Sequence, residues 1–234
     1  MTTIKRPDGR KVNELRPIKA KVGVVPNADG SAMFSFGNTV AIAAVYGPKE
    51  HHPRNQRNPE KATLRCNYNM MSFSVTDRIR PGPSRRSTEI SKITGWALEP
   101  VFMLEQFPNK VIDIHIQIIQ ADASTRCAGI NAAAMALAHA GIPMKDLVSS
   151  VSIGKLDKTL VTDVDKDEED WEDGEGATDI AMSFVSNSGK LSHIQLDGHI
   201  TSKQLKEAVK LGRESIKEIY EAQKKALKET GVEK

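Results

Sequence analysis

The clearest pattern in the chain is a predicted β-strand followed at once by a predicted helix. Within residues 111–119, isoleucine alternates with polar side chains, which is typical of a strand with one buried face. Residues 128–134 consist mainly of alanine and glycine, so a helix at this position can pack closely against its neighbours. The turn between the two elements ends in Ser124, Thr125 and Arg126. The pattern therefore predicts a helix whose first turn carries two hydroxyl side chains and an arginine.

Shorter alternating or apolar runs predict further strands. These strands are expected at residues 18–25, 39–46, 63–74, 148–153, 159–164, 179–185 and 191–196. Turn residues such as Asn187-Ser188-Gly189 separate neighbouring runs, as in a hairpin. Several of these strands are therefore expected to pair antiparallel.

Two amphipathic helices complete the predicted elements. One starts near Ser87 and has an apolar face formed by Ile90, Ile93, Ala97, Val101 and Leu104. Pro100 is expected to kink or interrupt this helix. The other is the last element of the chain, and Thr201 stands three residues before a glutamine, the spacing of a capping box. Together the elements predict an α/β (α+β) fold of mixed β-sheets packed with helices, with a long C-terminal helix. We expect a single domain over residues 1–234, with an extended segment at 1–17.

Composition narrows the class of protein. Hydrophobic residues make up 39% of the chain and charged residues 27%, as in globular proteins. No apolar run approaches the roughly 20 residues that span a bilayer, so no membrane association is expected. Cys66 and Cys127 are far apart and fit no metal-ligand spacing. We therefore expect a cytoplasmic protein with reduced thiols.

The charges are distributed unevenly, although the net charge is only +3. Residues 49–92 contain ten lysines and arginines against four acids, whereas residues 163–175 contain nine acids against one lysine. A basic region of this kind favours a polyanionic partner such as nucleic acid. Most of the acids in the second region are expected to lie in a solvated loop.

Three polar clusters interrupt the regular pattern and are chemically complementary. Two of them, Arg85-Arg86-Ser87-Thr88-Glu89 and Ser124-Thr125-Arg126, fall at helix starts. A helix start offers unpaired N–H groups and the positive end of the helix dipole, and arginine binds phosphate through a planar fork. The two helix starts could therefore converge on one phosphate. Taken singly, each is equally compatible with a solvated basic surface or an ordinary strand–helix connection.

The third cluster, residues 171–182, contains Asp179 at the threshold of an apolar strand. A carboxyl group at that position beside bound anions would have a raised pKa and could donate a proton. A separate feature is Tyr68 beside Arg65, which could stack on a base or could be a half-buried strand tyrosine.

In this order, the clusters resemble the RNase PH family of phosphorolytic exoribonucleases. The resemblance rests on Arg6-Pro7-Asp8-Gly9-Arg10, Leu15-Arg16-Pro17-Ile18, Asp29-Gly30-Ser31-Ala32, Phe36-Gly37-Asn38-Thr39, Arg86-Ser87-Thr88-Glu89-Ile90, residues 120–126, and Glu172-Asp173 with Asp179. Within the family, three further stretches resemble the catalytic RNase PH-like subunit of the archaeal exosome rather than the bacterial enzyme. These stretches are residues 80–86, 140–144 and 196–199.

The resemblance implies roles for individual residues. Inorganic phosphate, the co-substrate, would be bound by Arg86, Ser124, Thr125 and Arg126. Asp179 would be the catalytic carboxylate, and Asp173 would support it or help it to hold Mg²⁺. The RNA 3′ end would contact Arg65, Tyr68 and Arg85.

Two departures from the family pattern affect these roles. Ser124 stands where glycine is usual, so its side chain must be accommodated near the phosphate. The acidic segment is about three residues longer than the pattern implies, so Asp170 competes with Asp173 for the supporting role.

The resemblance also implies an activity and partners. The expected activity is phosphate-dependent 3′-to-5′ exoribonuclease action that releases nucleoside diphosphates, together with the reverse tailing reaction. The expected partners are single-stranded RNA 3′ ends, an inactive RNase PH-like paralogue in a heterohexameric ring, and RNA-binding cap subunits. The alternatives are a non-catalytic RNA-binding ring subunit and a stand-alone tRNA-trimming enzyme of the bacterial type.

Overall fold

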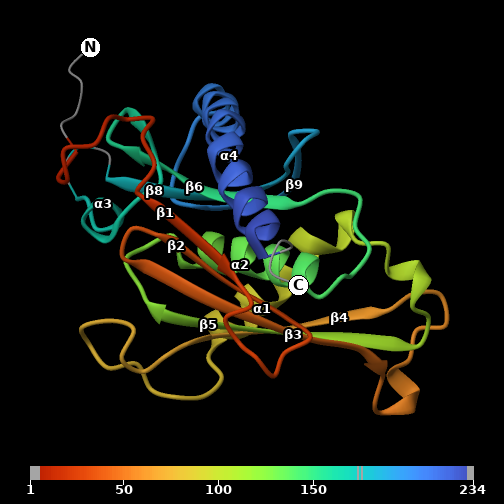
Figure 1. Cartoon of the computed structure of the whole chain (residues 1–234). Coiled ribbons are helices and arrows are strands. Elements are labelled where there is room, and N and C mark those ends of the chain that lie inside the picture. Colours follow the sequence, from red (N-terminus) through yellow and green to blue (C-terminus); the bar gives the residue numbers. More distant parts are fainter. Residues whose placement is uncertain (1–5, 173, 175, 231–234) are drawn as a thin grey trace.

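The computed structural model describes residues 6–172, 174 and 176–230 (Figure 1). Its strands are β1 Ile18–Val22, β2 Gly30–Phe36, β3 Thr39–Glu50, β4 Thr63–Met70, β5 Lys110–Gln120, β6 Val148–Leu156, β7 Thr159–Thr162, β8 Ala177–Val185 and β9 Lys190–Asp197. Its α-helices are α1 Arg85–Leu98, α2 Thr125–His139, α3 Lys166–Glu169 and α4 Ser202–Thr230. Short 3₁₀ helices occupy Arg54–Gln56, Glu99–Val101 and Leu104–Gln106.

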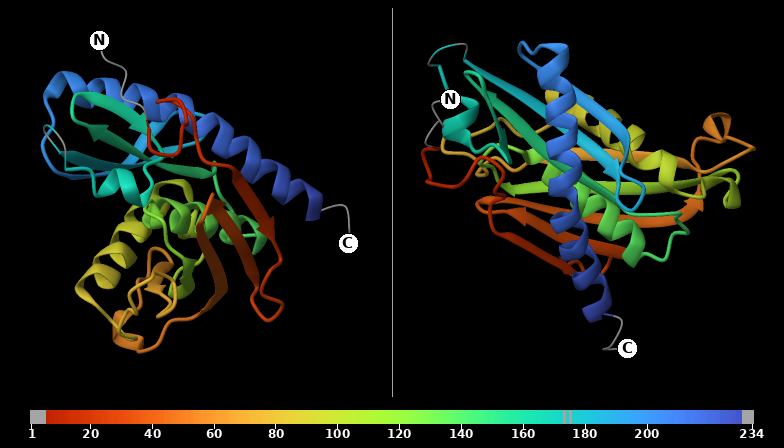
Figure 2. Two further views of the ribbon diagram at one scale, coloured as in Figure 1. Left: turned by 90° about the vertical axis from the view of Figure 1, so that its left-hand side faces the viewer. Right: turned by 90° about the horizontal axis from the view of Figure 1, so that it is seen from above.

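The elements form alternating layers of sheet and helix. One sheet has the strand order β1-β2-β3-β5-β4 and the other has the order β7-β6-β8-β9. Helices α1 and α2 lie between the two sheets, and α4 runs across the opposite face of the second sheet (Figures 1 and 2). All strand pairs are antiparallel except β4 with β5. The arrangement confirms the expected mixture of sheets and packed helices, including the long C-terminal helix.

Strand β5 follows the predicted alternation. Its isoleucines at 112, 114, 116 and 118 are completely buried on the side of the helices. Asp113, His115 and Gln117 therefore point to the other face of the sheet. The pattern was sufficient for this strand because only one of its faces packs against the helical layer.

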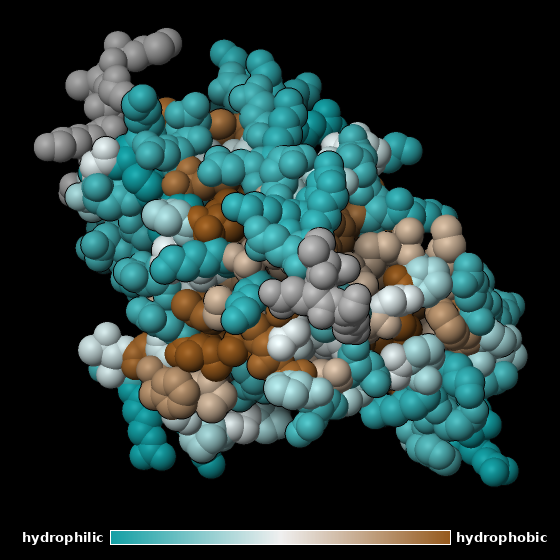
Figure 3. Space-filling view, viewed as in Figure 1, coloured by the Kyte–Doolittle hydropathy of each residue, from teal (hydrophilic) through white to brown (hydrophobic). Residues whose placement is uncertain are grey.

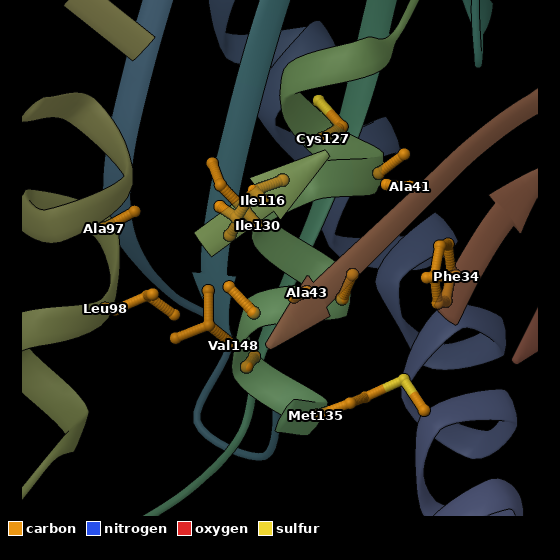
Figure 4. Packing of buried hydrophobic residues seen from close by; sticks show 14 of the residues in the cluster. Phe34, Ala41, Ala43, Ala97, Leu98, Ile116, Cys127, Ile130, Met135 and Val148 are labelled. Carbon is orange, nitrogen blue, oxygen red and sulfur yellow. The ribbon is translucent and has the colours of Figure 1, made fainter. Parts of the chain in front are cut away.

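Helix α2 is buried on nearly all sides because it contacts both sheets (Figure 4). Small side chains make this close approach possible. A Cβ atom at Gly129 would lie 3.2 Å from Cγ2 of Ile116, and one at Gly30 would lie 2.3 Å from the carbonyl oxygen of Ala136. The alanine-rich composition is therefore a packing requirement of the position between two sheets.

Two local details add to the predicted pattern. Strand β2 was not predicted, and it is buried on both faces. Helix α1 ends at Leu98, before Pro100, as expected, and the chain continues in 3₁₀ turns. Val101 and Leu104 are buried as expected, but they are buried from these turns rather than from α1.

The start of the C-terminal helix agrees with the sequence. The Gln204 N–H donates to Oγ1 of Thr201 at 3.3 Å, and the Thr201 N–H donates to Oε1 of Gln204 at 3.0 Å. These reciprocal bonds form the predicted capping box. Helix α4 packs against β8, where Gly212 lets the ring of Phe184 approach closely. In the part of the chain described here, no helix is both long and apolar enough to cross a bilayer.

The N-terminal segment, for which an extended run was expected, contains turns and makes buried contacts in its described part. Its described part, residues 6–17, begins with a turn in which the Gly9 N–H donates to the Arg6 carbonyl at 3.1 Å. The Arg6 guanidinium is buried and donates to both carboxylate oxygens of Glu168, at 2.6 and 2.8 Å. This partner lies far along the chain, so the local sequence did not reveal the contact.

The acidic segment is also more ordered than expected of a solvated loop. Asp163 and Glu168 are completely buried, and Asp165 and Glu168 form a capping box at the start of α3. The compensating charges come from Arg6, Arg10 and Arg16. These acids therefore have a structural role, which could not be seen from a local run of charges.

Candidate active site

The first part of the site is the start of α1. Ser84 caps this helix, with hydrogen bonds of 3.0 Å from the Ser87 N–H to Ser84 Oγ and 2.8 Å from the Ser84 N–H to Ser87 Oγ. Arg85 and Arg86 are exposed in its first turn, which contains no acidic residue. Two cations at the positive end of a helix dipole favour an anionic ligand.

The second part is the start of α2, which follows a tight turn. Ala123 and Ser124 both have a φ of +51°, in the left-handed region that glycine adopts most easily. The Ser124 hydroxyl donates to the Val164 carbonyl at 2.9 Å. The side chain is thus accommodated by pointing into the protein, so only the backbone of Ser124 remains for an anion.

The turn before α2 is held by residues distant in sequence. The carbonyl of Asp122 accepts hydrogen bonds from Nη1 of Arg16 at 2.5 Å and from Oγ1 of Thr39 at 2.8 Å. Arg16 also donates to both carboxylate oxygens of Asp163, at 2.9 and 2.7 Å. The Lys166 N–H donates to Oδ1 of Asp122 at 3.1 Å. The buried part of the acidic segment therefore supports the turn that presents the start of α2.

Tyr68 lies where the two helix starts meet. Burial raises the pKa of its hydroxyl, whereas the adjacent Thr125 hydroxyl and the charges of Arg86 and Arg126 lower it. Both guanidinium groups therefore lie near the Tyr68 hydroxyl. The buried Tyr68 hydroxyl and Thr125 Oγ1 make no well-formed hydrogen bond within the described residues. Two arginines beside unsatisfied hydroxyl groups form a suitable environment for a tetrahedral anion.

Asp179 lies on β8, on the sheet face that is turned toward α2. Burial raises the pKa of its carboxyl group, and the charges of Glu169 and Asp197 add to this effect. The hydroxyl of Ser152, 2.5 Å from Oδ1, and the charge of Arg126 act in the opposite direction. The net result is a carboxyl group with a raised pKa beside one of the two arginines.

Four residues around this site were not identified from the sequence. Ser152, Glu169, His193 and Asp197 come from β6, α3 and β9. Strand register could have found Asp197, because it lies directly opposite Asp179 in the β8–β9 pair. The pKa of His193 is lowered by burial and by the charge of Arg126.

Strand β9 also connects to α1 at the edge of the site. Nε2 of Gln195 donates to Oε1 of Glu89 at 2.6 Å. This hydrogen bond links β9 to the helix that carries Arg86, one turn before Glu89. The site is therefore bounded by the starts of α1 and α2 and by strands β8 and β9.

The residues expected to contact RNA have different environments. Arg85 is exposed and lies near the site. The Arg65 side chain is 52% exposed and forms two hydrogen bonds with Asp113, at 2.5 and 2.8 Å. Tyr68 is only 2% exposed, and its ring lies 3.6 Å from the position of a Cβ at Gly129. Base stacking needs an exposed ring face, and this chain alone exposes little of the Tyr68 ring, so the RNA contact stays a prediction beside the alternative of a buried strand tyrosine.

The two candidates for a supporting carboxylate can be partly separated. Asp170 ends α3 and pairs with Lys166 at 2.7 Å on the surface. Asp173 lies outside the described residues. Within the described chain, the one group of three acids close enough to share a metal ion is Asp8, Asp165 and Glu168. That group is already paired with Arg6 and Arg10.

A cavity of about 520 Å³ lies between α1 and the edge of β4, beside Arg65, Lys92 and Trp96. A smaller cavity of about 90 Å³ contacts Tyr68 and Arg86. Asp179 lines neither of these two cavities.

Comparison with known proteins identifies the family. The model described as 3′ exoribonuclease family, domain 1 matches residues 14–143, and the model of domain 2 of that family matches residues 146–215. The boundary between the two matches falls between α2 and β6. Residues from both matched regions contribute to one hydrophobic cluster around α2.

Relatives and solved structures agree with this result. The exosome complex component Rrp41 of Thermococcus kodakarensis is 49% identical over 225 residues, which are 96% of this chain and 89% of that protein. The Rrp41 component of Methanopyrus kandleri is 47% identical over 224 residues, or 96% of this chain and 92% of that protein. The crystal structure of rice Rrp46 has a TM-score of 0.84 at 26% identity and covers 95% of this chain and 100% of that chain. A chain of the Archaeoglobus fulgidus exosome with RNA bound to the active site has the same fold, with a TM-score of 0.81 at 19% identity over 93% of this chain and 92% of that chain. The chain therefore belongs to the RNase PH family of 3′ exoribonucleases.

Proposed function

We propose that this chain is the catalytic subunit of an exosome-type ring and that it degrades RNA from the 3′ end by phosphorolysis. The observation that carries the proposal is the meeting of two arginine-bearing helix starts at Tyr68, with Asp179 beside Arg126. A carboxyl group with a raised pKa next to an anion site fits an attack by phosphate coupled to proton transfer. The exosome names of the relatives support the same conclusion.

The attacking phosphate binds between the two helix starts. Arg86 and Arg126 supply charge, and Thr125 supplies a hydroxyl group and backbone at the start of α2. Phosphate and the RNA linkage are both anions, and their repulsion is large in a partly desolvated site. Two guanidinium groups offset this repulsion and orient the phosphate in line with the terminal linkage.

The reaction exchanges one phosphorus–oxygen bond for another. An oxygen of inorganic phosphate bonds to the terminal phosphorus, and the bond from that phosphorus to the ribose 3′-oxygen breaks. Asp179 supplies the proton that the departing 3′-oxygen accepts. The products are a nucleoside diphosphate and an RNA shortened by one residue. The reaction is reversible because the diphosphate product retains a phosphoanhydride, so 3′ tailing is the reverse activity.

The proposal includes a magnesium ion bound by carboxylates. Asp179 would hold it together with Asp173, since Mg²⁺ is usually bound through one or two carboxylates and retains several waters. When bound, the ion would neutralise negative charge at the reacting phosphates. The residues of the chain remain responsible for orienting the phosphate and for moving the proton.

RNA is held mainly through its backbone. Arg65 and Arg85 lie on exposed surfaces and contact the 3′ end, so binding should tolerate any sequence and weaken with salt. The ring partners proposed are an inactive RNase PH-like paralogue and RNA-binding cap subunits. The exosome names of the relatives support an arrangement in which a neighbouring subunit helps to hold the RNA.

Phosphate dependence tests the proposal directly. The assembled complex should degrade poly(A) only when inorganic phosphate is present and should release nucleoside diphosphates. Degradation at the same rate without phosphate, with monophosphate products, contradicts phosphorolysis.

A variant of the proposed acid tests the role of this chain. Asp179→Asn should lower the rate of diphosphate release at least 100-fold, the scale of general acid catalysis, while RNA binding is retained. Undiminished activity of this variant assigns catalysis to another subunit and favours the non-catalytic alternative.

A further inference from the structure

Ser152 is placed to control the orientation of Asp179. Its hydroxyl donates to Oδ1 of Asp179 at 2.5 Å, and the residue is 1% exposed. Ser152 is on β6 and Asp179 is on the neighbouring strand β8. Within the described chain, the Ser152 hydroxyl and Oδ1 of Asp179 are each other's hydrogen-bond partners, and Oδ2 has no partner.

The backbone around Ser152 is fixed by the segment that also supports the start of α2. The Asp163 N–H donates to the Ser152 carbonyl at 2.8 Å. Gly154 lies directly opposite Asp179 in the strand pair, and a Cβ atom there would be 2.5 Å from Cγ2 of Val164. This segment therefore packs tightly on β6, so Ser152 is a rigid point from which a hydrogen bond can hold a carboxyl group.

The charges around Asp179 show why its carboxyl group needs a fixed hydrogen-bond partner. Arg126 from α2 attracts its carboxylate, whereas Glu169 from α3 and Asp197 from β9 repel it. The attraction alone would draw the carboxylate toward the guanidinium group. Within the described residues, however, Asp179 and Arg126 do not form an ion pair, for which the limit is 4.0 Å. A direct pair would neutralise the charge of Arg126, which the proposed phosphate needs.

We propose that Ser152 is a positioning residue that keeps the Asp179 carboxyl group apart from Arg126, with Oδ2 facing the substrates and the guanidinium free for phosphate. This inference rests on the proposed function, because it assigns the geometry of that same site. It explains how an acid and an anion-binding arginine can lie side by side without cancelling each other.

An isosteric pair of variants tests the role of the hydroxyl. Ser152→Thr keeps the hydroxyl donor. Ser152→Val has the same shape as the Thr variant but carries a methyl group in place of the hydroxyl. We expect the Val variant of the full chain, in its native assembly, to bind inorganic phosphate about tenfold more weakly and to have a lower kcat. The Thr variant should retain most of the phosphate affinity. Ser152→Ala, measured in the same way, covers the case in which either larger side chain disturbs folding.

A second serine and a double variant separate positioning from a general structural effect. Ser150 lies on the same strand and face, and its hydroxyl bonds to the Met182 carbonyl and the Ser183 hydroxyl, both at 3.0 Å. Ser150→Ala should therefore leave phosphate affinity unchanged. In an Asp179→Asn background there is no carboxylate to pair with Arg126, so adding Ser152→Val should cause no further loss of phosphate affinity.

The outcomes are distinct. Equal phosphate affinity and kcat in the Val and Thr variants overturn the positioning role, as does the same loss in Ser150→Ala. An undiminished effect of Ser152→Val in the Asp179→Asn background also overturns it. Absence of phosphate binding by the wild-type complex contradicts the proposed function itself, and is recognised before any variant is compared.

Discussion

Ser124 illustrates how one residue can satisfy two conflicting requirements. Its φ of +51° costs a residue with a side chain about 1–2 kcal/mol, and its hydroxyl offsets part of that cost by bonding to the Val164 carbonyl. Glycine avoids the strain but lacks the hydrogen bond. The usual glycine at this position and the serine found here are therefore two solutions to the same backbone geometry.

The first prediction compares two substitutions of Ser124. Ser124→Ala keeps the backbone strain and loses the hydrogen bond, so it should lower the free energy of unfolding by about 1 kcal/mol. Ser124→Gly loses the same bond but removes the strain, so it should be more stable than the alanine variant by about 1 kcal/mol. Urea unfolding of both variants measures this order. An alanine variant as stable as the glycine variant contradicts the strain argument.

The second prediction concerns the charge on Asp179. Its pKa in the folded chain is raised above the ordinary value of 3.8, so the ionised form destabilises the folded state. This cost is absent below pH 3.8, where the group is protonated in both states, and complete above the folded-state pKa. Asp179→Asn should therefore raise Tm near neutral pH, by an amount that shrinks as the pH falls toward 4. Thermal unfolding at several pH values, with chelator and without phosphate, measures this increase in Tm. An increase that does not depend on pH contradicts an origin in the charge of Asp179.

At the scale of single residues, the sequence patterns indicated which residues are candidates for the site better than they indicated where the side chains point. Asp179 and Arg126 could be selected because a carboxylate at a strand threshold and an arginine at a helix start are unusual. Whether a side chain points to the site or into the core depends on packing. Tyr68 and the hydroxyl of Ser124 both point inward, and no local pattern distinguishes that outcome.

Among the elements, the acidic segment has the least expected role. Its buried acids bind three arginines of the N-terminal segment, and one of these, Arg16, also binds the Asp122 carbonyl in the turn before α2. Because a buried charge needs its partner, the two segments and the turn should unfold together. The start of α2 is therefore held by an ion network, in addition to its own capping.

The third prediction tests this network. Asp163→Asn leaves the Arg16 guanidinium buried without its full partner and should lower the free energy of unfolding by about 3–5 kcal/mol. Glu229→Gln in α4 breaks an exposed ion pair with Lys225 and should change the free energy of unfolding by less than about 0.5 kcal/mol. Chemical denaturation of both variants makes the comparison. A small effect of Asp163→Asn, similar to that of the surface pair, contradicts the structural role of the network.

The elements that the sequence predicted share one property: the pattern that identifies each of them lies entirely within the element. Strand β5 alternates, α2 is built from small residues, and α4 has its own capping box. In strand β2 burial does not alternate, because both of its faces are covered. The order of the N-terminal and acidic segments depends on contacts across more than 140 residues. Such contacts leave no local period.

At the scale of the whole molecule, apolar side chains remain uncovered on the single chain. Figure 3 shows apolar patches between the hydrophilic areas of one face. Large exposed apolar residues within the described chain include Phe73, Trp96, Leu191, Ile194 and Leu196. Three of these lie on β9, the outermost strand next to the proposed site. Exposed apolar groups at a sheet edge are typical of surfaces that contact another subunit.

The fourth prediction is that this chain works only within an assembly. A ring neighbour that packs against the apolar edge at β9 would lie next to β8, the strand that carries Asp179, and RNA would then be held by two subunits. Native mass spectrometry of the complex isolated from cells should give a hexamer in which this chain alternates with a second RNase PH-like chain. A homohexamer, with six times the chain mass of 25.7 kDa, favours the stand-alone bacterial type instead. Phosphorolysis should appear when the two chains are mixed and should be much slower with either alone. Full activity of an isolated monomer contradicts a shared site, because a single chain would then hold the RNA without a neighbour.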